Sequence, residues 1–299
     1  MYTSFNARAV GLSLPASETI AIAAEAGFEG VDLMVRDLLA AGEDPAELRR
    51  RMDDLGLRGG AFPLPVAWKG DADAYRRDLA DLPRLAEAAA RLGLTRTGTW
   101  VLPAMPLRFD TEPERARHRA EIVELHHRRL GTIAQVLEGH DLRLGLEFIG
   151  AESFRAAHGE PFITSTGKLI IELKSIFGEH PNVGLLVDSF HLHAANDPIL
   201  IPIEGSTGRI DWVHVADLPA SASPDRSRIN DDFRALPGEN GAVPVARDLK
   251  ILAADGYDGP VTAEPLARCQ SLLGKGPREV AALVKRSLDS VWPDLRGRR

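Results

Sequence analysis

Short apolar runs alternate with longer segments of helical periodicity along the whole chain. Runs of this length are typical of strands buried in a parallel sheet, and the segments between them repeat apolar residues at the helical spacing. The expected strands lie near residues 8–14, 30–35, 58–66, 96–102, 142–149, 182–190, 210–216 and 259–265. This alternation predicts eight βα units that share one sheet.

Several of the expected helices carry signals at their ends. Ser17 precedes an apolar periodic segment, and Asp44 stands before Pro45 at a first helical position. Glycines follow the expected last turns at Gly27, Gly56, Gly93 and Gly139. No strand leads into a G-x-G-x-x-G loop, which makes an open doubly wound sheet the weaker alternative. The chain therefore predicts an α/β fold, a single (β/α)₈ TIM barrel domain over residues 1–299.

Composition narrows the classes of partner. The 299 residues include 36 Lys and Arg against 43 Asp and Glu, a net charge of −7, which argues against nucleic acid as a partner. The one cysteine, Cys269, excludes an internal disulfide and fits a reducing compartment. No leader-like segment and no apolar stretch of 18 residues is found, so we expect a cytoplasmic protein with no membrane partner. The pattern leaves a homo-oligomer open.

Four polar residues end four consecutive apolar runs. They are Glu147 in LGLEFIG, Asp188 in VGLLVDSFHLH, His214 in IDWVHVAD and Glu264 in GPVTAEPL. Alternate side chains of a strand point to opposite faces, and the face opposite each of these residues is uniformly aliphatic. The aliphatic faces should pack on the helices. The four polar side chains are therefore expected inside the barrel, at the carboxyl ends of strands five to eight, where barrel enzymes keep their active sites.

Three carboxylates and one imidazole form a hard, oxygen-rich ligand set. Buried without partners, each charged group would cost several kcal/mol, and one divalent cation would remove that cost. The set suits Mn²⁺, Co²⁺, Mg²⁺ or Zn²⁺. The alternative is a group of separate ion pairs or helix caps, but four residues of one parity at consecutive strand ends favour a metal site. A cation there could stabilise the enediolate that forms when a proton next to a carbonyl is removed.

The segments LGLEFIG, NVGLLVDSFHLHA, IDWVHVAD, RALPG and VTAEPL, within residues 142–266, resemble a known family. They are similar to motifs of the xylose isomerase-like TIM barrel superfamily, also called the sugar phosphate isomerase/epimerase family, and most of all to its 2-keto-myo-inositol isomerase branch. The resemblance implies one metal ion held by Glu147, Asp188, His214 and Glu264. It also implies that Glu147 and Glu264 are the catalytic acid/base pair.

Two further residues are implied by the same resemblance. His191, three residues after Asp188, and Arg234, three before Pro237, match substrate-binding positions. Two departures concern substrate contacts: PGENG is one residue longer than the expected Pro-Gly-x-Gly turn, and the polar residue expected soon after the strand-five glutamate has only Glu152 or Ser153 as candidates. The long loops at residues 217–243 and 150–163, on the face that carries function, would decide which substrate binds.

The resemblance implies a divalent-metal-dependent isomerase or epimerase acting on a keto-sugar or keto-cyclitol, with 2-keto-myo-inositol (inosose) as the best single candidate. A lyase of the same superfamily is the alternative: an inosose dehydratase, a dehydroshikimate dehydratase or a C-glycoside-cleaving enzyme. A non-catalytic sugar-binding barrel is the alternative from a different class. The endonuclease IV branch would need more ligand histidines and a basic surface.

Other residues carry weaker expectations. His126 and His127 lie on a long charged segment and are expected to be solvated. Aromatic residues at or near strand ends could wall a sugar pocket, although core packing is the more frequent role: Phe62, Trp68, Trp100, Phe190 and Trp212. Loop arginines and Lys275 raise the alternative of a phosphorylated substrate.

Overall fold

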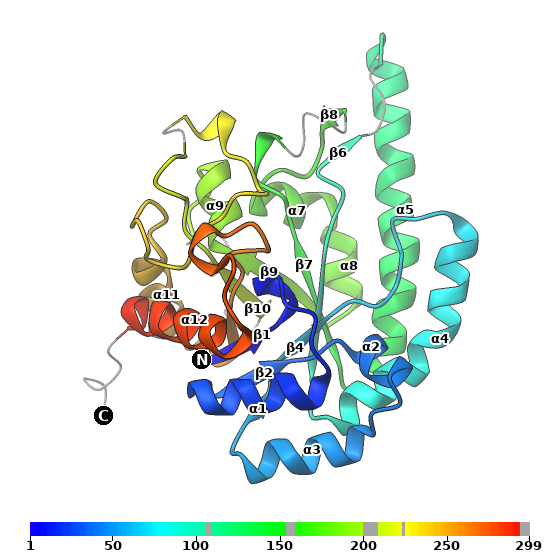
Figure 1. The fold of residues 1–299 in the computed structure, drawn as a ribbon. Coiled ribbons are helices and arrows are strands. Elements are labelled where there is room, and N and C mark those ends of the chain that lie inside the picture. Colours follow the sequence, from blue (N-terminus) through cyan, green and yellow to red (C-terminus); the bar gives the residue numbers. More distant parts are fainter. Residues whose placement is uncertain (106–108, 154–158, 200–208, 223–224, 294–299) are drawn as a thin grey trace.

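The structure is a computed structural model, and it describes residues 1–105, 109–153, 159–199, 209–222 and 225–293. One sheet of parallel strands forms the centre (Figure 1). In sheet order its strands are β3 (Arg58–Gly59), β2 (Gly30–Asp32), β1 (Tyr2–Asn6), β11 (Pro260–Ala263), β10 (Ile210–Val215), β9 (Val183–Asp188), β7 (Arg143–Glu147), β5 (Arg96–Trp100) and β4 (Ala61–Pro63). The small strands β6 (Ala104–Met105) and β8 (Glu160–Pro161) pair separately above it.

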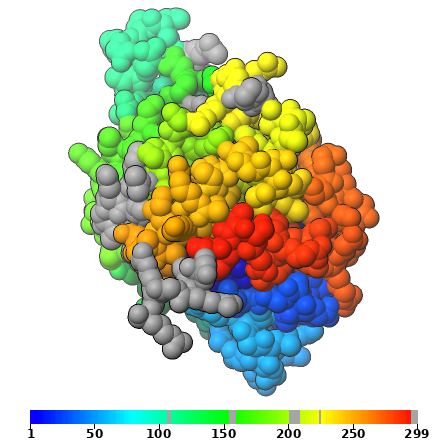
Figure 2. Space-filling view, turned by 90° about the vertical axis from the view of Figure 1, so that its left-hand side faces the viewer, coloured from blue at the N-terminus to red at the C-terminus, as the bar shows by residue number. Residues whose placement is uncertain are grey.

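Helices surround the sheet and connect its strands. They are α1 (Ala16–Ala26), α2 (Val35–Ala40), α3 (Pro45–Asp54), α4 (Ala72–Arg91), α5 (Glu112–Glu138), α7 (Thr166–Glu172), α8 (Lys174–Glu179), α9 (Ser189–Ala195), α11 (Val245–Ala254) and α12 (Pro277–Val291). The last of these, α12, packs against the first, α1 (Figure 2). Among the described residues, no helix combines the length and apolar character needed to cross a bilayer.

The third expected strand consists of two parts that pair with different neighbouring strands, and this closes the barrel. Its first part, β3, pairs with β2, and its second part, β4, pairs with β5. Only Gly60 lies between the two parts, and its N–H donates to the carbonyl of Val31. A side chain at Gly60 would overlap the carboxylate of Asp32, so this crossing requires glycine. The predicted barrel is confirmed.

The first strand was predicted wrongly. It is Tyr2–Asn6 rather than residues 8–14, which instead begin with a short 3₁₀ helix at Arg8–Val10 that ends at Gly11 (φ 78°). The strand is hidden in the sequence because polar residues face the barrel interior. The hydroxyl of Ser4 donates to Asp32 (2.7 Å), and Asn6 accepts from the N–H of Ala9 (3.1 Å).

The helix signals were partly right. Asp44 caps α3 as predicted, accepting from the N–H of Ala46 at 2.9 Å, and Gly27 ends α1 in the left-handed conformation. Ser17, by contrast, lies inside the first turn of α1. The carboxylate of Glu43 caps that helix from outside, accepting from the N–H groups of Ala16 and Ser17 (both 2.9 Å). Gly139 keeps an ordinary helical φ of −62°.

Strand parity agrees with the sequence. Ala61, Leu186 and Trp212 form a small apolar cluster separate from the main core, whereas the residues on the opposite faces of β7, β9, β10 and β11 belong to that core. A β carbon at Gly98 would meet the side chains of Leu186 and Trp212. The cluster therefore fills the barrel interior, and the residues that follow it on the same faces point to the barrel mouth.

His126 on α5 is buried, which contradicts the expectation of a solvated side chain. Its Nδ1 donates to the carbonyl of Ile122 (2.7 Å), and its Nε2 accepts from the N–H of Leu102 (3.4 Å). The ring packs edge-on against Trp68 and Phe162. α5 begins beyond the barrel and then runs along it (Figure 1), so the inner face of its later part is covered. Helical periodicity alone did not locate that face.

We expect acid to destabilise the protein through His126. Burial lowers the pKa of this imidazole from 6.5 to about 4. Because the unfolded state takes up the proton first, the stability contributed by the neutral ring is present above pH 6.5 and is lost as the pH falls from 6.5 to about 4, by up to about 3 kcal/mol. Urea unfolding at pH 7.5 and 4.5 would measure this. His126→Gln should reduce the difference, whereas His127→Gln should keep it; an equal pH dependence in wild type and His126→Gln would refute the assignment.

Candidate metal and active site

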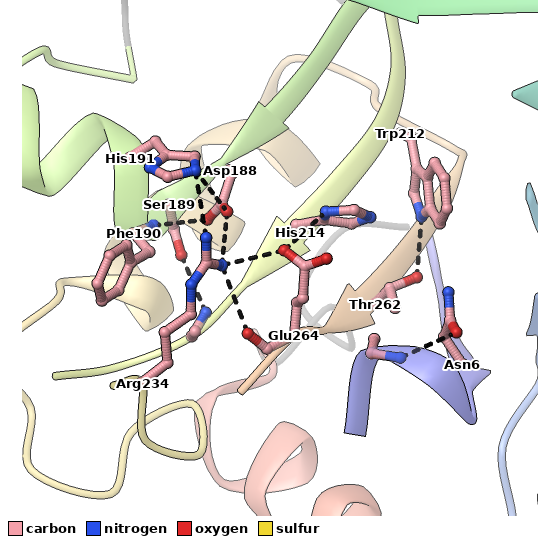
Figure 3. A network of polar contacts seen from close by, with 12 residues as sticks. Asn6, Asp188, Ser189, Phe190, His191, Trp212, His214, Arg234, Thr262 and Glu264 are labelled. Atoms are coloured by element: carbon pink, nitrogen blue, oxygen red, sulfur yellow. Dashed lines mark hydrogen bonds and ion pairs between the residues drawn. The ribbon is translucent and has the colours of Figure 1, made fainter. Parts of the chain in front are cut away.

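The four polar residues predicted at strand ends lie at one end of the barrel. Glu147 and Asp188 are the last residues of β7 and β9, and His214 is the fifth residue of β10, paired in register with Asp188. Glu264 follows β11 directly, and its N–H donates to the carbonyl of Val215 (2.9 Å). Since the four strands are consecutive in the parallel sheet, their carboxyl ends lie together. Figure 3 shows the side chains of Asp188, His214 and Glu264 close to one another.

Two overlapping groups of side chains have the geometry of a metal site. One consists of Asp188, His214 and Glu264, and the other of Glu147, Asp188 and His191; within each group the potential ligand atoms lie within 4.8 Å of one another. Asp188 belongs to both groups. His191, expected only as a substrate-binding residue, is therefore placed beside two of the expected ligands.

Arg234 lies between these carboxylates. Its Nη1 donates to Asp188 Oδ2 (2.7 Å) and to Glu264 Oε2 (3.0 Å), and its Nη2 donates to Asp231 Oδ1 (2.7 Å) and lies 3.2 Å from His191 Nε2. The side chain is buried, with its guanidinium over the ring of Phe190. Figure 3 shows it as the centre of the polar network. Sequence reasoning missed Asp231, which carries no motif of its own.

The two glutamates have opposite protonation preferences. Burial, followed by the charge of Asp188, raises the pKa of Glu147 well above its usual value. Burial would also raise the pKa of Glu264, but His214 and Arg234 hold it at about 2. For His214, burial lowers the pKa, and the carboxylates, Glu264 foremost, outweigh that effect and raise it to about 9. In the protein without a bound cation, protonation is therefore favoured at Glu147 and disfavoured at Glu264.

Buried imidazole nitrogens indicate a further ligand. Among the described residues, neither ring nitrogen of His214 has a hydrogen-bond partner, and Nδ1 of His191 has none either. His214 Nδ1 lies 3.2 Å from Glu264 Oε2, but without hydrogen-bond geometry. A buried polar atom without a partner costs about 1–3 kcal/mol. A divalent cation held by one nitrogen of His214 and the neighbouring carboxylate oxygens would remove that cost for the bound nitrogen, so these residues fit such an ion.

Asp188 is fixed by its place between strand and helix. Its Oδ1 accepts from the N–H of Phe190 (2.8 Å) and so caps α9, while Oδ2 faces Arg234. The VDSFHLH motif therefore has a local cause: a strand that ends in aspartate starts a helix at once, and the third residue of that helix is His191.

Asp217 organises the long loop that carries Arg234. Its Oδ2 accepts from the N–H groups of Asn240 (2.8 Å) and Gly241 (2.6 Å), and its Oδ1 accepts from Val243 (2.9 Å). The backbone of Asp217 also pairs with Ala235, the residue after Arg234. The longer PGENG turn is thus accommodated by one buried carboxylate. No sequence signal points to this role, because the N–H groups of Asn240, Gly241 and Val243 lie 23 to 26 residues away.

The candidate residues of the strand-five loop do not enter the network. Glu152 and Ser153 are exposed, and the Ser153 hydroxyl donates to the carbonyl of Ile229 in the strand-seven loop (2.8 Å). Residues 154–158 of the expected loop 150–163 lie outside the described residues. On the strand next to β7, Trp100 ends β5 in register with Glu147, and the ammonium of Lys69 lies 3.8 Å from the ring centroid of Trp100. Sequence reasoning missed Lys69.

Comparisons with known proteins agree with this architecture. The chain is 28% identical over 263 residues to a 3-dehydroshikimate dehydratase of Pseudomonas putida, which covers 85% of this chain and 36% of that protein, so the chain spans about a third of that relative. It is 23% identical over 197 residues to an inosose isomerase of Halalkalibacterium halodurans, covering 65% of this chain and 61% of that protein. The solved structure of the IOLI protein with a zinc atom superposes with a TM-score of 0.77 at 17% identity, covering 97% and 98% of the two chains. The model of the xylose isomerase-like TIM barrel matches residues 20–289. The chain therefore belongs to the xylose isomerase-like TIM barrel family.

Proposed function

We propose that the chain is a divalent-metal-dependent isomerase or epimerase that moves a proton next to the carbonyl of a keto-sugar or keto-cyclitol, with 2-keto-myo-inositol as the best single candidate. The observation that carries this proposal is the pair of ligand groups that share Asp188. One of them contains His214, whose buried nitrogens have no hydrogen-bond partner among the described residues. The inosose isomerase among the relatives supports the substrate class.

Glu147, Asp188, His214 and Glu264 would hold one cation, Mn²⁺, Co²⁺, Mg²⁺ or Zn²⁺. When bound, the ion would supply positive charge to the carbonyl and neighbouring hydroxyl oxygens of the substrate. The zinc atom in the similar IOLI structure supports a divalent ion without deciding its identity for this chain.

The side chains of the site would have different roles in proton transfer and substrate binding. Glu147 and Glu264 extend from β7 and β11, which have β9 and β10 between them, so their carboxylates would approach a substrate from two sides. One carboxylate oxygen would take the proton from carbon, and the other would return a proton to the neighbouring carbon or to the opposite face. His191 and Arg234, which lie against Asp188, would bind substrate hydroxyls and orient the reacting carbon.

A dehydratase is the second candidate, because two 3-dehydroshikimate dehydratases each match 85% of this chain at 28% identity. Removal of the same kind of proton would then be followed by departure of a hydroxyl group from the adjacent carbon as water. The first step and its residues would be unchanged. The two functions differ only in what the substrate loses.

Reaction in deuterated water distinguishes these functions. The protein would be supplied in turn with each of the four cations and with 2-keto-myo-inositol or 3-dehydroshikimate, and the products followed by NMR and mass spectrometry. An isomerase or epimerase places deuterium on carbon without loss of water, whereas a dehydratase yields a product lighter by one water. Chelator-treated protein is the control. If neither substrate exchanges deuterium and a sugar binds equally well with chelator present, the non-catalytic barrel is correct.

A further inference from the structure

Lys69 joins two segments at the rim of the barrel. It lies between β4 and α4, and its Nζ donates to the carbonyl of Trp100 (2.9 Å) and to the hydroxyl of Thr99 (3.2 Å) at the end of β5. The ammonium lies 3.8 Å from the ring centroid of Trp100 and 4.8 Å from that of Trp68. Two aromatic rings and two oxygens therefore hold its position.

The Trp100 side chain faces the barrel mouth. Gly98 faces the interior, since a β carbon there would meet Leu186 and Trp212, and Trp100 follows Gly98 by two residues on the same face. Trp100 is also paired in register with Glu147, and the N–H of Val101 donates to the Glu147 carbonyl (2.8 Å). The ammonium thus lies over the end of β5, the strand next to β7, which carries the proposed acid/base residue Glu147.

The positive charge of Lys69 is not balanced by a carboxylate in contact with it among the described residues. Among the described residues no carboxylate lies within 4.0 Å of its Nζ, whereas Arg234, the cation at the centre of the site, contacts three carboxylates: those of Asp188, Asp231 and Glu264. Partial burial lowers the pKa of Lys69 to about 8, against the opposing charge of Glu147. An ammonium has three donors, and two protein oxygens take two of them.

We propose that Lys69 is a substrate-binding residue that holds an anionic group of the substrate, a carboxylate or a phosphate, above Trp100. The inference rests on the proposed function and refines its substrate class. The carboxylates of the mouth would otherwise repel an anionic substrate, and the positive charge of Arg234 is already balanced by the carboxylates that it contacts. Lys69 therefore determines whether a charged keto-sugar or keto-acid is accepted beside a neutral one.

Matched ligand pairs test this assignment. Each pair differs only in charge: shikimate against its methyl ester, and myo-inositol 1-phosphate against myo-inositol. Binding to the metal-loaded protein would be followed by tryptophan fluorescence, because Trp68 and Trp100 both lie within 5 Å of the ammonium, and by calorimetry. We expect wild type to bind the anion of at least one pair about tenfold or more tightly than its neutral partner. The pair that shows the preference identifies the anionic group.

Substitutions of Lys69 distinguish a role in binding the anionic group from a role in stabilising the fold. Lys69→Met should reduce the preference to within about twofold, whereas Lys69→Arg should retain most of it. Lys285→Met, which removes a lysine paired with Asp289 within α12, is the control and should match wild type. A lysine that only joins β4 to β5 would change the melting temperature but not the ratio of the two affinities. No preference in wild type, or an unchanged preference in Lys69→Met, would overturn the inference.

The outcome is separable from that of the proposed function. Deuterium exchange into neutral 2-keto-myo-inositol tests the proton transfer and needs no anionic group. If exchange occurs and the anion preference is absent, only the assignment of Lys69 fails. If no substrate exchanges deuterium but a Lys69-dependent preference is measured, the anion site stands and the proposed reaction fails.

Discussion

Glu147→Gln and Glu264→Gln should each lower kcat by about 1000-fold while leaving the barrel folded. Each substitution keeps the size of the side chain and one oxygen that can still face a cation, but removes the carboxylate that takes or returns a proton. Positioned acids and bases typically contribute about 10²- to 10⁴-fold to a rate. Kinetics on the substrate that exchanges deuterium, together with metal analysis of each purified variant, would measure both effects.

The two variants should also fail at different steps. If one glutamate removes the proton and the other returns it, the variant that keeps the removing glutamate should still exchange the substrate proton with deuterated water while forming little product. The other variant should do neither. Glu152→Gln, five residues after Glu147 on an exposed part of the loop, is the matched control and should keep activity within about twofold. Full activity in either Glu147→Gln or Glu264→Gln would reject the proton-transfer scheme.

The second half of the barrel was predictable because residues 144–146 of β7 and 183–187 of β9 are apolar on both faces of their strands. Glu147 and Asp188 stand out only against such runs, and strand parity then places them inside the barrel. Parallel strands must end at the same edge of a sheet, so local pattern was enough to bring these residues together. The family motifs cover the same strands, which is why resemblance and pattern agreed there.

The first half of the barrel was harder to predict from the sequence because its strands place polar side chains in the barrel interior. Asp32 accepts hydrogen bonds from Ser4, Thr262 and the N–H of Ala61, all within 2.8 Å. These groups satisfy one another only across strands β1, β2, β4 and β11, so in the sequence each looks like an interruption of an apolar run. The burial of His126 depends in the same way on distant residues that cover one turn of α5.

Side chains delivered by loops were the least predictable part of the site. The contact of Arg234 with Asp188 joins residues 46 positions apart, and it depends on a loop whose shape is fixed by Asp217. Lys69 reaches the site only because β4 and β5 are neighbours. Sequence spacing contains no information on such contacts. Arg234 was predicted only from the family resemblance of its motif, and that resemblance did not indicate which carboxylates Arg234 contacts.

Asp188→Ala should cause the largest loss of metal affinity of any single substitution in the site, about 100-fold or more. Asp188 is the residue common to both groups of potential ligands, so its removal takes a carboxylate oxygen from each. Titration of chelator-treated protein with Mn²⁺, Co²⁺ or Zn²⁺ would give the affinities, and metal analysis would give the occupancy after purification. Activity should fall in parallel, because the substrate oxygens would lose the positive charge that the ion supplies.

Three further variants help to interpret Asp188→Ala. That substitution also leaves the buried guanidinium of Arg234 with one carboxylate fewer, a change that can destabilise the fold, so Asp188→Asn and melting curves must accompany it. Asp231→Asn changes a different partner of Arg234, which also lies 3.8 Å from His191 Nε2, but it leaves every residue of the two ligand groups in place and should keep the metal. His191→Ala should keep most of the metal and weaken substrate binding. Wild-type metal affinity in both Asp188 variants would place the cation elsewhere and remove the basis of the proposed function.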